Sequence, residues 1–461
     1  MTATQSVRAC VGAAICIACS STQAQELTAP DSTVAQLQEV VVTAQRHSQD
    51  LEKTPLAITA VSADALINQG VTSPLGLQDL VPSISIIQHA GTGTNIAIRG
   101  LVTNTTAPQG GPSVSVNVDE IFVARTQATD SALFDINRIE VLRGPQGTLY
   151  GKNSTAGAVN IITNEPQQTF EANASVEAGN YSAVTTSGMV NVPINSELFI
   201  RGAFQTVDHD GYIGELEDER GYAGRIKLLY MPLDDVSVLL NTHFNHQGGH
   251  GSTDVGYSLA PTAVNPSNPW TQNLYPQNAG HLNNDIWGVD LRVSWNAPFA
   301  TLAYIGGYEV LDIGQAQITQ LAAVSTFSQI SRAFSNELRL VSNTQATTAG
   351  SYSWVAGLYF FNERQSYDPN IASGPLHVIE VEPAIPDNSR AVFVQATYAI
   401  LDRLRLTGGV RYTHDDESQE GTFTEIIGPN RTEFPITGSV TYSNVSWKGG
   451  VEIDLSDRVM S

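Results

Sequence analysis

The feature that most constrains the fold is a series of long segments, from about Gln167 onward, in which apolar and polar residues alternate. In residues 236–244, Leu240 and Phe244 fall on one face and His243 falls on the other. Because successive side chains of a strand point to opposite faces, a period of two predicts β-strands. At about ten residues or more, these strands are long enough to cross a membrane in a barrel. Twelve are expected, near residues 168–178, 182–192, 197–207, 222–231, 235–246, 285–296, 300–312, 332–342, 352–364, 390–400, 404–414 and 440–454.

The links between these strands alternate in length after the first short one. Short turns on one side and long loops on the other are the layout of an outer-membrane barrel. Tight turns are expected at residues 193–196, 232–234, 297–299 and 401–403, with 343–351 a somewhat longer member of this class. Long links are expected near residues 208–221, 247–284, 313–331, 365–389 and 415–439.

Composition narrows the possible functions. The chain has 45 Asp+Glu against 23 Lys+Arg, a formal charge of −22. This acidic balance argues against a nucleic-acid partner, which requires a basic surface. Charged residues are only 15% of the chain, below the roughly 25% of a soluble domain, so a charge-rich disordered chain and a coiled coil are both excluded. The 38 glycines suit an all-β protein with many turns.

The first 24 residues are typical of a cleaved signal peptide. Arg8 is followed by a short apolar stretch at residues 9–18, and small residues stand near Ala24. Ten apolar residues are too few to span a bilayer as a helix. Cleavage after Ala24 would remove all three cysteines of the chain. The alternative is a lipoprotein acylated at Cys19, which Cys16 disfavours at its position three residues earlier. We therefore expect the chain to be exported and, from the barrel layout of its strands, to enter the outer membrane of a Gram-negative cell.

Three segments are expected after residue 24. Residues 25–47 are an N-terminal segment, residues 48–166 have the composition of a compact mixed domain, and residues 167–461 contain the long strands. Glycines punctuate the mixed domain and suit tight turns. Within it, helices are expected at residues 62–68 and 76–80, and strands at 84–88, 95–98, 113–118 and 138–142.

A β-prone run stands in the N-terminal segment, at residues 39–44. An exposed strand of this kind can add itself to the sheet edge of a partner through main-chain hydrogen bonds. An ordinary buried strand is the alternative interpretation. The run consists of Glu39, Val40, Val41, Val42, Thr43 and Ala44.

Several short motifs of the mixed domain occur in a fixed order. They are Ile98-Arg99-Gly100, Val118-Asp119-Glu120, the run from Arg143 to Gly151 and the run from Gly157 to Thr163. These motifs resemble the plug domain of TonB-dependent outer-membrane receptors, and residues 39–44 resemble a TonB box. The resemblance covers the plug almost end to end and continues through the strands. The plug-motif residues are Arg99, Gly100, Arg143, Gly144, Gly147 and Gly151.

The resemblance implies an α+β plug domain followed by an antiparallel transmembrane β-barrel. It also implies active uptake of a scarce ligand, most often a ferric siderophore, driven through TonB of the inner-membrane energising complex. Residues 39–44 would bind TonB, and the other partners would be outer-membrane lipid and the small-molecule ligand. No enzyme activity, cofactor or metal site of the protein's own is implied. The alternatives are uptake of another nutrient, a transcription-signalling receptor of the same fold, and a passive porin, which needs no plug.

The size of the plug bears on the number of strands. Strands about 4.8 Å apart and tilted by about 40° give a barrel about 24 Å wide for twelve strands and about 44 Å wide for twenty-two. Side chains remove about 10 Å of this width. A plug of about 115 residues is about 34 Å across, so it fits only the wider barrel. We therefore expect about twelve of twenty-two strands, belonging to the N-terminal part of a longer protein.

Two further patterns superficially resemble ligand sites, but the details of each argue against such a site. His243, His246 and His250 have spacing that could suit a metal, but His243 and His246 should point to opposite faces of a strand, the first to the lumen and the second to the lipid side or rim. The run 144–153 superficially suggests a phosphate-binding loop, but Gln146 and Asn153 occupy positions that require Gly and Ser or Thr.

Charged residues give three more candidates. Acidic clusters at residues 215–219 and 415–417 are expected in external loops, where they would be solvated or would contact a cation. Arg99 and Arg143 are expected to form structural salt bridges with barrel carboxylates; the alternative is that they line the path of an anionic chelate. No arrangement of residues suggests catalysis.

Overall fold

The computed structural model divides the chain into two units, Met1–Glu39 and Val40–Ser461, and the first lies outside the described residues. The signal-peptide prediction for residues 1–24 therefore lies outside them too. The structure describes residues 41–43, 45–47, 49–51, 54–71, 74–89, 93–103, 111–129, 133–211, 218–250, 281–318, 324–373, 377–456 and 459–460.

A five-stranded sheet forms the centre of the plug, in the order β3-β8-β9-β6-β7. Strands β6 and β9 are parallel and the other pairs are antiparallel. The middle strands β8 and β9 share an apolar face, on which Ile139, Val141, Val159 and Ile161 are all buried. The bounds are β3 Ile58–Ser62, β6 Val114–Val118, β7 Ile121–Phe122, β8 Ile136–Arg143 and β9 Gly157–Thr163.

Short helices and a hairpin pack against this sheet. Ser62 caps the first helix, because its hydroxyl accepts a hydrogen bond from the amide of Ala65 at 3.3 Å. The elements are α1 Ala63–Asn68, η2 Pro74–Gly76, α2 Leu77–Leu80, η3 Thr126–Ala128 and the antiparallel pair β4 Ile84–His89 and β5 Gly93–Ile98. The helices and the four strands predicted for this domain are therefore confirmed, whereas β3, β7 and β9 had not been predicted as strands.

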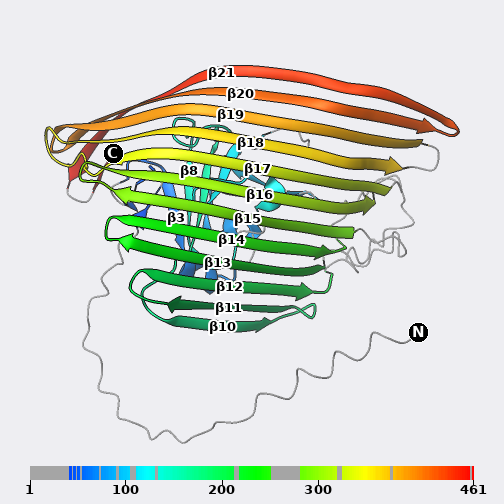
Figure 1. The fold of residues 1–461 in the computed structure, drawn as a ribbon, viewed down its shortest axis with the longest axis horizontal. Coiled ribbons are helices and arrows are strands. Elements are labelled where there is room, and N and C mark those ends of the chain that lie inside the picture. The colour runs from blue at the N-terminus through cyan, green and yellow to red at the C-terminus, as the bar shows by residue number, and fades with distance from the viewer. Residues whose placement is uncertain are drawn as a thin grey trace, which may run out of the picture. The chain divides into compact units, whose positions relative to one another are not determined.

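The long strands form one antiparallel sheet in which neighbours in sequence are neighbours in space. Figure 1 shows them in chain order from β10, in green, to β21, in red. The twelve predicted strands are confirmed, and β22 Val459–Met460 adds a short pairing at β21. They are β10 Glu171–Ala178, β11 Val184–Pro193, β12 Leu198–His209, β13 Glu219–Leu233, β14 Val236–Gly249, β15 His281–Asn296, β16 Ala300–Ile318, β17 Val324–Ser342, β18 Tyr352–Ser373, β19 His377–Leu401, β20 Leu404–Ile427 and β21 Asn430–Ser456.

Several of these strands are longer than predicted. The expected long links 365–389 and 415–439 are mostly strand, because β18 continues to Ser373, β19 starts at His377, and β20 and β21 meet across residues 428–429. The polar residues there break the apolar alternation that the prediction used, yet main-chain pairing continues through them. The acidic residues 415–417 therefore lie on β20 and not in a loop, which corrects that prediction.

The two faces of the sheet have different environments. One face packs on the plug, and its Ile286, Leu311 and Ile313 belong to the same apolar core as the plug strands. The other face carries exposed apolar side chains such as Leu240 and Phe244. The alternation predicted for residues 236–244 is therefore confirmed.

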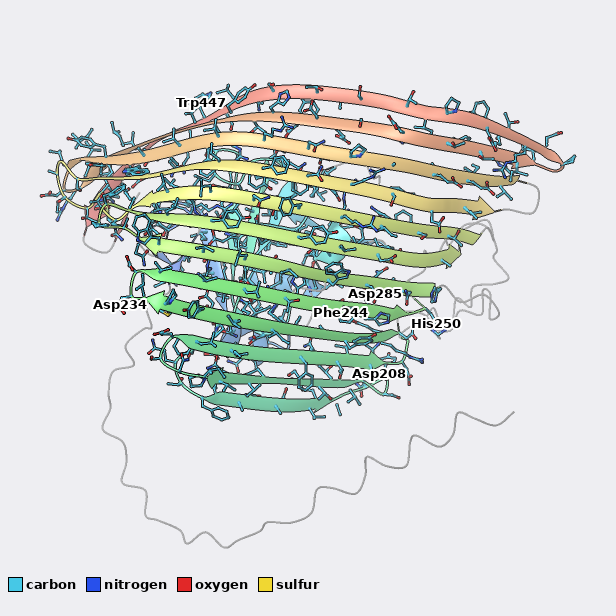
Figure 2. The ribbon with its side chains drawn as sticks, in the orientation of Figure 1. Asp208, Asp234, Phe244, His250, Asp285 and Trp447 are labelled. Atoms are coloured by element: carbon cyan, nitrogen blue, oxygen red, sulfur yellow. The ribbon has the colours of Figure 1, made fainter. Side chains whose placement is uncertain are left out.

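The two ends of the sheet also differ. In Figure 2, Asp234 marks a short turn at one end, while Asp208, Asp285 and His250 lie at the opposite end, where the long links are. No helix among the described residues is long and apolar enough to cross a membrane.

Candidate functional site

The N-terminal segment is bound to the plug as a short strand. β1, Val41–Val42, pairs with β2, Gln49–Asp50. The side chain of Val42 is fully buried, whereas Val41 is 43% exposed. After the strand, Thr43 turns toward the plug sheet, where its amide N and its Oγ1 both donate to Oε1 of Glu140, at 2.8 and 3.1 Å. Residues 41–43 are therefore held by the buried side chain of Val42, by the Glu140 carboxylate, and by Arg138, which donates from Nη2 to Oγ1 of Thr43 at 3.4 Å.

Glu140 lies in the middle of β8 and is fully buried. Arg138 donates from Nε to the same oxygen at 2.9 Å, and Asn160 approaches the other oxygen at 3.5 Å. Asn160 also donates to the hydroxyl of Tyr150 at 2.7 Å. Because the protein interior strengthens hydrogen bonds to a charge, this carboxylate is a strong fixed acceptor at the point where the N-terminal segment meets the plug.

Arg46 forms a second anchor, between the segment and the wall of the sheet. Its guanidinium lies 3.5 Å from Glu120, 3.7 Å from Glu337 on β17, and 4.5 Å above the ring of Tyr150. Arg339 pairs with both carboxylates. Burial lowers the pKa of Arg46, but Glu337, Tyr150 and Glu120 outweigh it and the pKa rises. For Tyr150, burial raises the pKa to about 12.

On one side of the plug, the wall supplies cations and the plug supplies carboxylates. Lys227 on β13 donates to Asp119 at 2.8 Å and to Thr163 at 2.5 Å. Arg201 on β12 binds Asp135 through Nε and Nη2, at 2.9 and 2.6 Å. Burial raises the pKa of Asp119, but Lys227 and then Arg225 outweigh it and lower the pKa to about 2. The carboxylate of Asp119 is thus held ionised by the wall.

Farther along the sheet, at β18 and β19, the plug supplies the cations and the wall supplies the carboxylates. Arg125 of the plug binds Glu363 on β18 through two hydrogen bonds, at 2.6 and 2.5 Å. Lys152 of the plug pairs with Asp387 on β19. A guanidinium and a carboxylate joined by two bonds fix orientation as well as distance. Directional, charged contacts therefore bind the plug to two separate groups of strands, β12 and β13, and β18 and β19.

The glycines of the plug motifs allow positive φ angles and a close approach of the backbone to the wall. Gly100, Gly144 and Gly151 have positive φ angles of 76°, 100° and 75°, which glycine adopts without strain. A Cβ on Gly151 would lie 2.5 Å from the guanidinium of Arg411 on β20, so the loop also approaches the wall closely. Gly147 lies beside Ser446 of β21, whose hydroxyl reaches the Gly147 carbonyl at 3.5 Å.

The salt bridges predicted between the sheet and Arg99 and Arg143 are not found among the described residues. Within the residues that the structure describes, neither forms an ion pair with a wall carboxylate. Arg143 instead donates to the carbonyl of Ala57 at 3.4 Å, inside the plug. The charged contacts between plug and wall come from Asp119 and Glu120 of the Val118-Asp119-Glu120 motif. They also come from residues outside the quoted motifs, such as Arg125 and Lys152.

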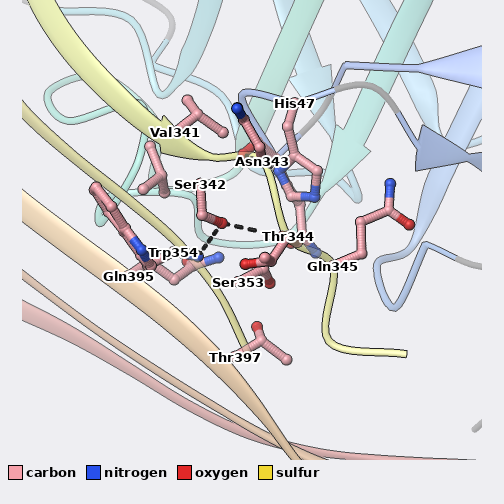
Figure 3. A pocket seen from close by; sticks show the side chains of 12 residues that line it. His47, Val341, Ser342, Asn343, Thr344, Gln345, Ser353, Trp354, Gln395 and Thr397 are labelled. Carbon is pink, nitrogen blue, oxygen red and sulfur yellow. Dashed lines mark hydrogen bonds between the residues drawn. The ribbon is translucent and has the colours of Figure 1, made fainter. Parts of the chain in front are cut away.

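A polar cavity of about 100 Å³ lies between the N-terminal segment and the wall (Figure 3). Gln45 and His47 line one side, and residues of β17, the following turn, β18 and β19 line the other. Ser342 accepts a hydrogen bond from the amide of Trp354 at 2.9 Å on that wall. Burial lowers the pKa of His47, so its ring is neutral beside the cavity. The segment is thus separated from the wall at this point and is not packed into an apolar core.

The remaining sequence candidates are only partly described. Glu39, Val40 and Ala44 lie outside the described residues, as do residues 215–217 of the first acidic cluster. His243 lies near Asp290 and Glu309 on the plug-facing side, whereas His246 stacks on the exposed ring of Tyr222. The prediction that these two histidines face opposite sides is confirmed.

Glu140 and Arg46 are the candidate site residues that the sequence did not indicate. Both are charges in a chain with few charges, and Arg46 stands two residues after the end of the predicted TonB box. For Glu140, the available signal was a carboxylate between the apolar residues Ile139 and Val141, since a buried carboxylate needs partners. The partners themselves are 97 residues apart in the case of Thr43 and Glu140, and no local pattern indicates them.

Two sequence families match the chain. The TonB-dependent Receptor Plug Domain matches residues 50–158, and the TonB dependent receptor-like beta-barrel matches residues 230–460, about half of the chain. The chain belongs to the TonB-dependent receptor family. Members of this family are receptors and transporters and not enzymes, and they have the predicted combination of a plug and antiparallel strands.

Individual members of the family show how far the likeness extends. The pesticin receptor of Yersinia pestis is 24% identical over 404 residues, which are 83% of this chain and 56% of that receptor. The chain spans about half the length of the curated relatives it matches.

Two solved structures have the same fold. The ferric yersiniabactin uptake receptor FyuA of Yersinia pestis has a TM-score of 0.75 at 21% identity, over 87% of this chain and 62% of that one. The ferric-catecholate import receptor Fiu of E. coli K12, in its open form, has a TM-score of 0.71 at 17% identity, over 89% and 69%.

Proposed function

We propose that this chain belongs to an outer-membrane active transporter that takes up a scarce external iron chelate and is energised by TonB. The family and the names of its relatives, which are receptors for ferric chelates and related ligands, support the class of ligand. They differ in the ligand that they bind, so the proposal concerns ferric siderophores as a class.

The observation that carries the proposal is the way in which the plug is bound to the sheet. Charged contacts join it to β12, β13, β17, β18 and β19, and breaking a buried pair leaves an uncompensated charge, which costs several kcal/mol. A passive pore would gain nothing from a plug fixed in this manner. Movement of such a plug requires work from outside, which is the part that we assign to TonB.

The TonB contact is assigned to residues 39–44. Val41 is half exposed on a strand of only two residues, and a short exposed strand can pair with the sheet edge of a partner. Of the six residues, Val41, Val42 and Thr43 are described. Arg46 anchors the chain to the plug and wall just beyond them, so a pull on the segment would act first on this charged cluster.

The test of the TonB contact is Val41→Pro in the full-length receptor. Proline removes the amide donor and fixes φ, which prevents strand addition. We expect ligand binding to cells to be retained while uptake of the radioactive iron chelate falls to the level of a tonB deletion. Val41→Thr keeps the amide and the β-branched shape, so it serves as the control and should transport normally. Normal uptake by Val41→Pro would refute the assignment of the TonB box.

The ligand is tested by growth under iron limitation. A strain lacking the gene should fail to grow on one chemical class of ferric chelate, and restoring the full-length gene should restore growth on that class alone. Cells should be compared on hydroxamate, catecholate and carboxylate chelates, with cobalamin and copper complexes as the other nutrients. If growth were lost only on cobalamin or only on copper complexes, that nutrient would replace iron as the proposed cargo.

Export through a cleaved signal peptide is part of the proposal. The mature protein should begin at or near Gln25 and contain no cysteine, since Cys10, Cys16 and Cys19 all precede that residue. Mass spectrometry of the outer-membrane protein measures its N-terminus directly. A lipid-modified Cys19 would show that the chain is anchored as a lipoprotein instead.

A further inference from the structure

We propose that Arg332 of β17 and Arg364 of β18 form a binding site for a phosphorylated lipid headgroup on the outer face of the sheet. The two arginines are direct partners in the register of these strands, and both side chains are exposed. The inference rests on the proposed function, because it requires the sheet to lie in an outer membrane. It concerns a lipid around the receptor and not the cargo that the receptor takes up.

The arginines stand at one boundary of an apolar band on this face. Phe334 follows Arg332 by two residues on β17, and its ring is exposed. The exposed Trp287 of β15 stands in the same cross-strand row as Arg332, because both residues pair with Val310 of β16. Exposed aromatic rings form girdles at the two interfaces of a membrane-spanning sheet. The row therefore lies where lipid chains give way to headgroups.

The opposite boundary is marked by a second ring on β15. Trp295 is exposed eight residues after Trp287, which is about 27 Å along a strand, or about 20 Å of bilayer at a tilt of about 40°. The apolar band of outer-membrane sheets has a similar height, about 25 Å. Trp295 lies beside the short turn at residues 297–299, so Trp287 and the two arginines lie toward the long links. That end faces the outside of the cell in such sheets.

The two charges lack a counter-charge within the described residues. Like charges directly opposite each other destabilise a strand pair, yet neither Arg332 nor Arg364 forms an ion pair or a side-chain hydrogen bond with a described residue. Asp312 of β16 lies diagonal to Arg332 and attracts it, but the two form no ion pair. An anion bound on this face would remove the repulsion between the arginines.

A phosphate group fits this pair. Side chains at directly opposite positions have Cβ atoms about 5 Å apart, so two guanidinium groups can approach the same phosphate, each through two parallel hydrogen bonds. A lipid fits the surroundings better than a free phosphate ion does, because its chains would cover the rings of Phe334 and Trp287, which are exposed beside the charges. The ligand is therefore a phosphate carried on a lipid headgroup.

A third arginine adds positive charge near the site. Arg390 of β19 is exposed and pairs with Phe360, whose ring is exposed on the same outer face. Arg390 also forms no ion pair with a described residue. The carboxylate of Asp416, on the next strand, is already bound by His414 and Thr441. This part of the boundary is therefore basic, which favours an anionic headgroup.

The experiment measures binding of lipid A, a phosphorylated glycolipid, to the full-length receptor after removal of bound lipid in nonionic detergent. Native mass spectrometry gives the dissociation constant. Arg332→Gln and Arg364→Gln should each weaken binding about tenfold, as loss of a hydrogen bond to a charged group predicts. Lipid A without its phosphates should bind the unmodified receptor about tenfold more weakly or worse. Excess inorganic phosphate should not displace the intact lipid.

Arg220→Gln is the matched control. Arg220 of β13 is also exposed on the outer face at the long-link end, two residues before Tyr222, but its partner on β12 is Asp208 and not a second arginine. Binding should change by less than about twofold. Equal losses in Arg220→Gln and Arg332→Gln would show a non-specific effect of charge and would overturn the inference. So would unchanged binding in both Arg332→Gln and Arg364→Gln, or displacement of the lipid by inorganic phosphate.

The result separates this inference from the proposed function. Exposed substitutions of this kind leave folding intact in most proteins, which the heat-resistant band on unboiled gels checks, and if one arginine variant fails to fold, the other decides. If lipid binding depends on the arginines but Val41→Pro leaves uptake intact, the TonB contact is wrongly assigned while the lipid site stands. If Val41→Pro abolishes uptake but neither arginine affects lipid binding, the lipid site fails while the proposed function stands.

Discussion

Two of the four lysines of the chain join the plug to the sheet. Lys227 binds Asp119 from the wall, and Lys152 binds Asp387 from the plug. A buried ion pair adds little net stability, because desolvation offsets the attraction, but removal of one partner leaves the other charge buried and unpaired. At the scale of single residues, these contacts therefore fix where the plug lies more than they stabilise it.

Lys227→Met tests this view. Methionine fills a similar space without the charge, so Asp119 loses its cationic partner and keeps only the hydrogen bonds that Thr163 donates to it. We expect the plug of the full-length receptor to lose about 3–5 kcal/mol of stability, measured as the urea concentration at which protease digests it. Lys448→Met is the control, since Lys448 forms no ion pair with a described plug residue, and it should change stability by less than about 1 kcal/mol. Equal effects of the two variants would contradict the assignment.

Acid should weaken the same contact. The pKa of Asp119 lies at about 2, below its ordinary value of 3.8, so its stabilisation is complete above pH 4 and is lost as pH falls through 2. This difference corresponds to about 2 kcal/mol. Between pH 5 and pH 2, the plug of the unmodified receptor should lose stability. The plug of Asp119→Asn should lose about 2 kcal/mol less over the same range. Parallel pH profiles of the two proteins would show that Asp119 is not held ionised by Lys227.

At the scale of elements, the sequence predicted which strands exist and in what order better than it predicted where they end. The period of two placed all twelve long strands, because burial on one face and exposure on the other leaves a direct pattern. It underestimated β19, β20 and β21, whose outer halves mix polar and apolar residues without a regular alternation. Main-chain pairing continues there, with side-chain contacts such as that of Phe423 with Phe434 across the strands. Strand β9 was quoted as a motif and not predicted as a strand, since an apolar run buried on both faces has no alternation to read.

The sequence revealed less of the site. The β-prone run at residues 39–44 and the turn glycines follow from local composition, but the contacts of Glu140, Arg46 and Lys227 join residues far apart in the chain. Arg99 and Arg143 were singled out because they stand in recognisable motifs. Their expected partners on the wall are absent among the described residues, which shows that a motif indicates a residue's place in the plug and not what it binds.

Gly157→Ala tests the pairing of β8 and β9. A Cβ at Gly157 would lie 2.1 Å from the carbonyl oxygen of Leu142 on the adjacent strand, and a backbone oxygen cannot move aside without parting the two strands. We expect a loss of about 3 kcal/mol in plug stability, seen as early protease digestion in urea. Gly100→Ala is the comparison, since its φ is also positive but no atom lies within 4 Å of the added methyl group. It should cost about 1 kcal/mol, and a larger loss than for Gly157→Ala would contradict this explanation.

At the scale of the whole plug and sheet, the wall residues that pair with the plug are cations on some strands and carboxylates on others. Strands β12, β13 and β15 offer Arg201, Lys227 and Arg292 to plug-side carboxylates, whereas β18 and β19 offer Glu363 and Asp387 to plug cations. Strand β17 carries both signs, in Glu337 and Arg339. A plug rotated against the sheet would place like charges together. Like charges at an interface cost several kcal/mol, so this arrangement specifies a single orientation of the plug.

The outer face of the sheet gives the last prediction. Leu240 lies in the middle of an apolar stretch on this face, between Leu228 and Leu291 on the neighbouring strands, and is 40% exposed. If this face contacts lipid, Leu240→Arg places a charge near the middle of the bilayer and should cost about 2–4 kcal/mol. The folded, heat-resistant fraction of the full-length receptor on unboiled gels measures this loss.

Thr206→Arg provides the matched position near the end of the same face. Thr206 also points outward and pairs with Tyr222, close to the long-link end of the strands. A charge at the edge of the bilayer reaches the headgroups, so it should cost only about 0–1 kcal/mol. The depth dependence is the decisive result, because a water-exposed face would tolerate both arginines equally. Equal folded fractions for Leu240→Arg and Thr206→Arg would therefore refute the placement of this face in the membrane.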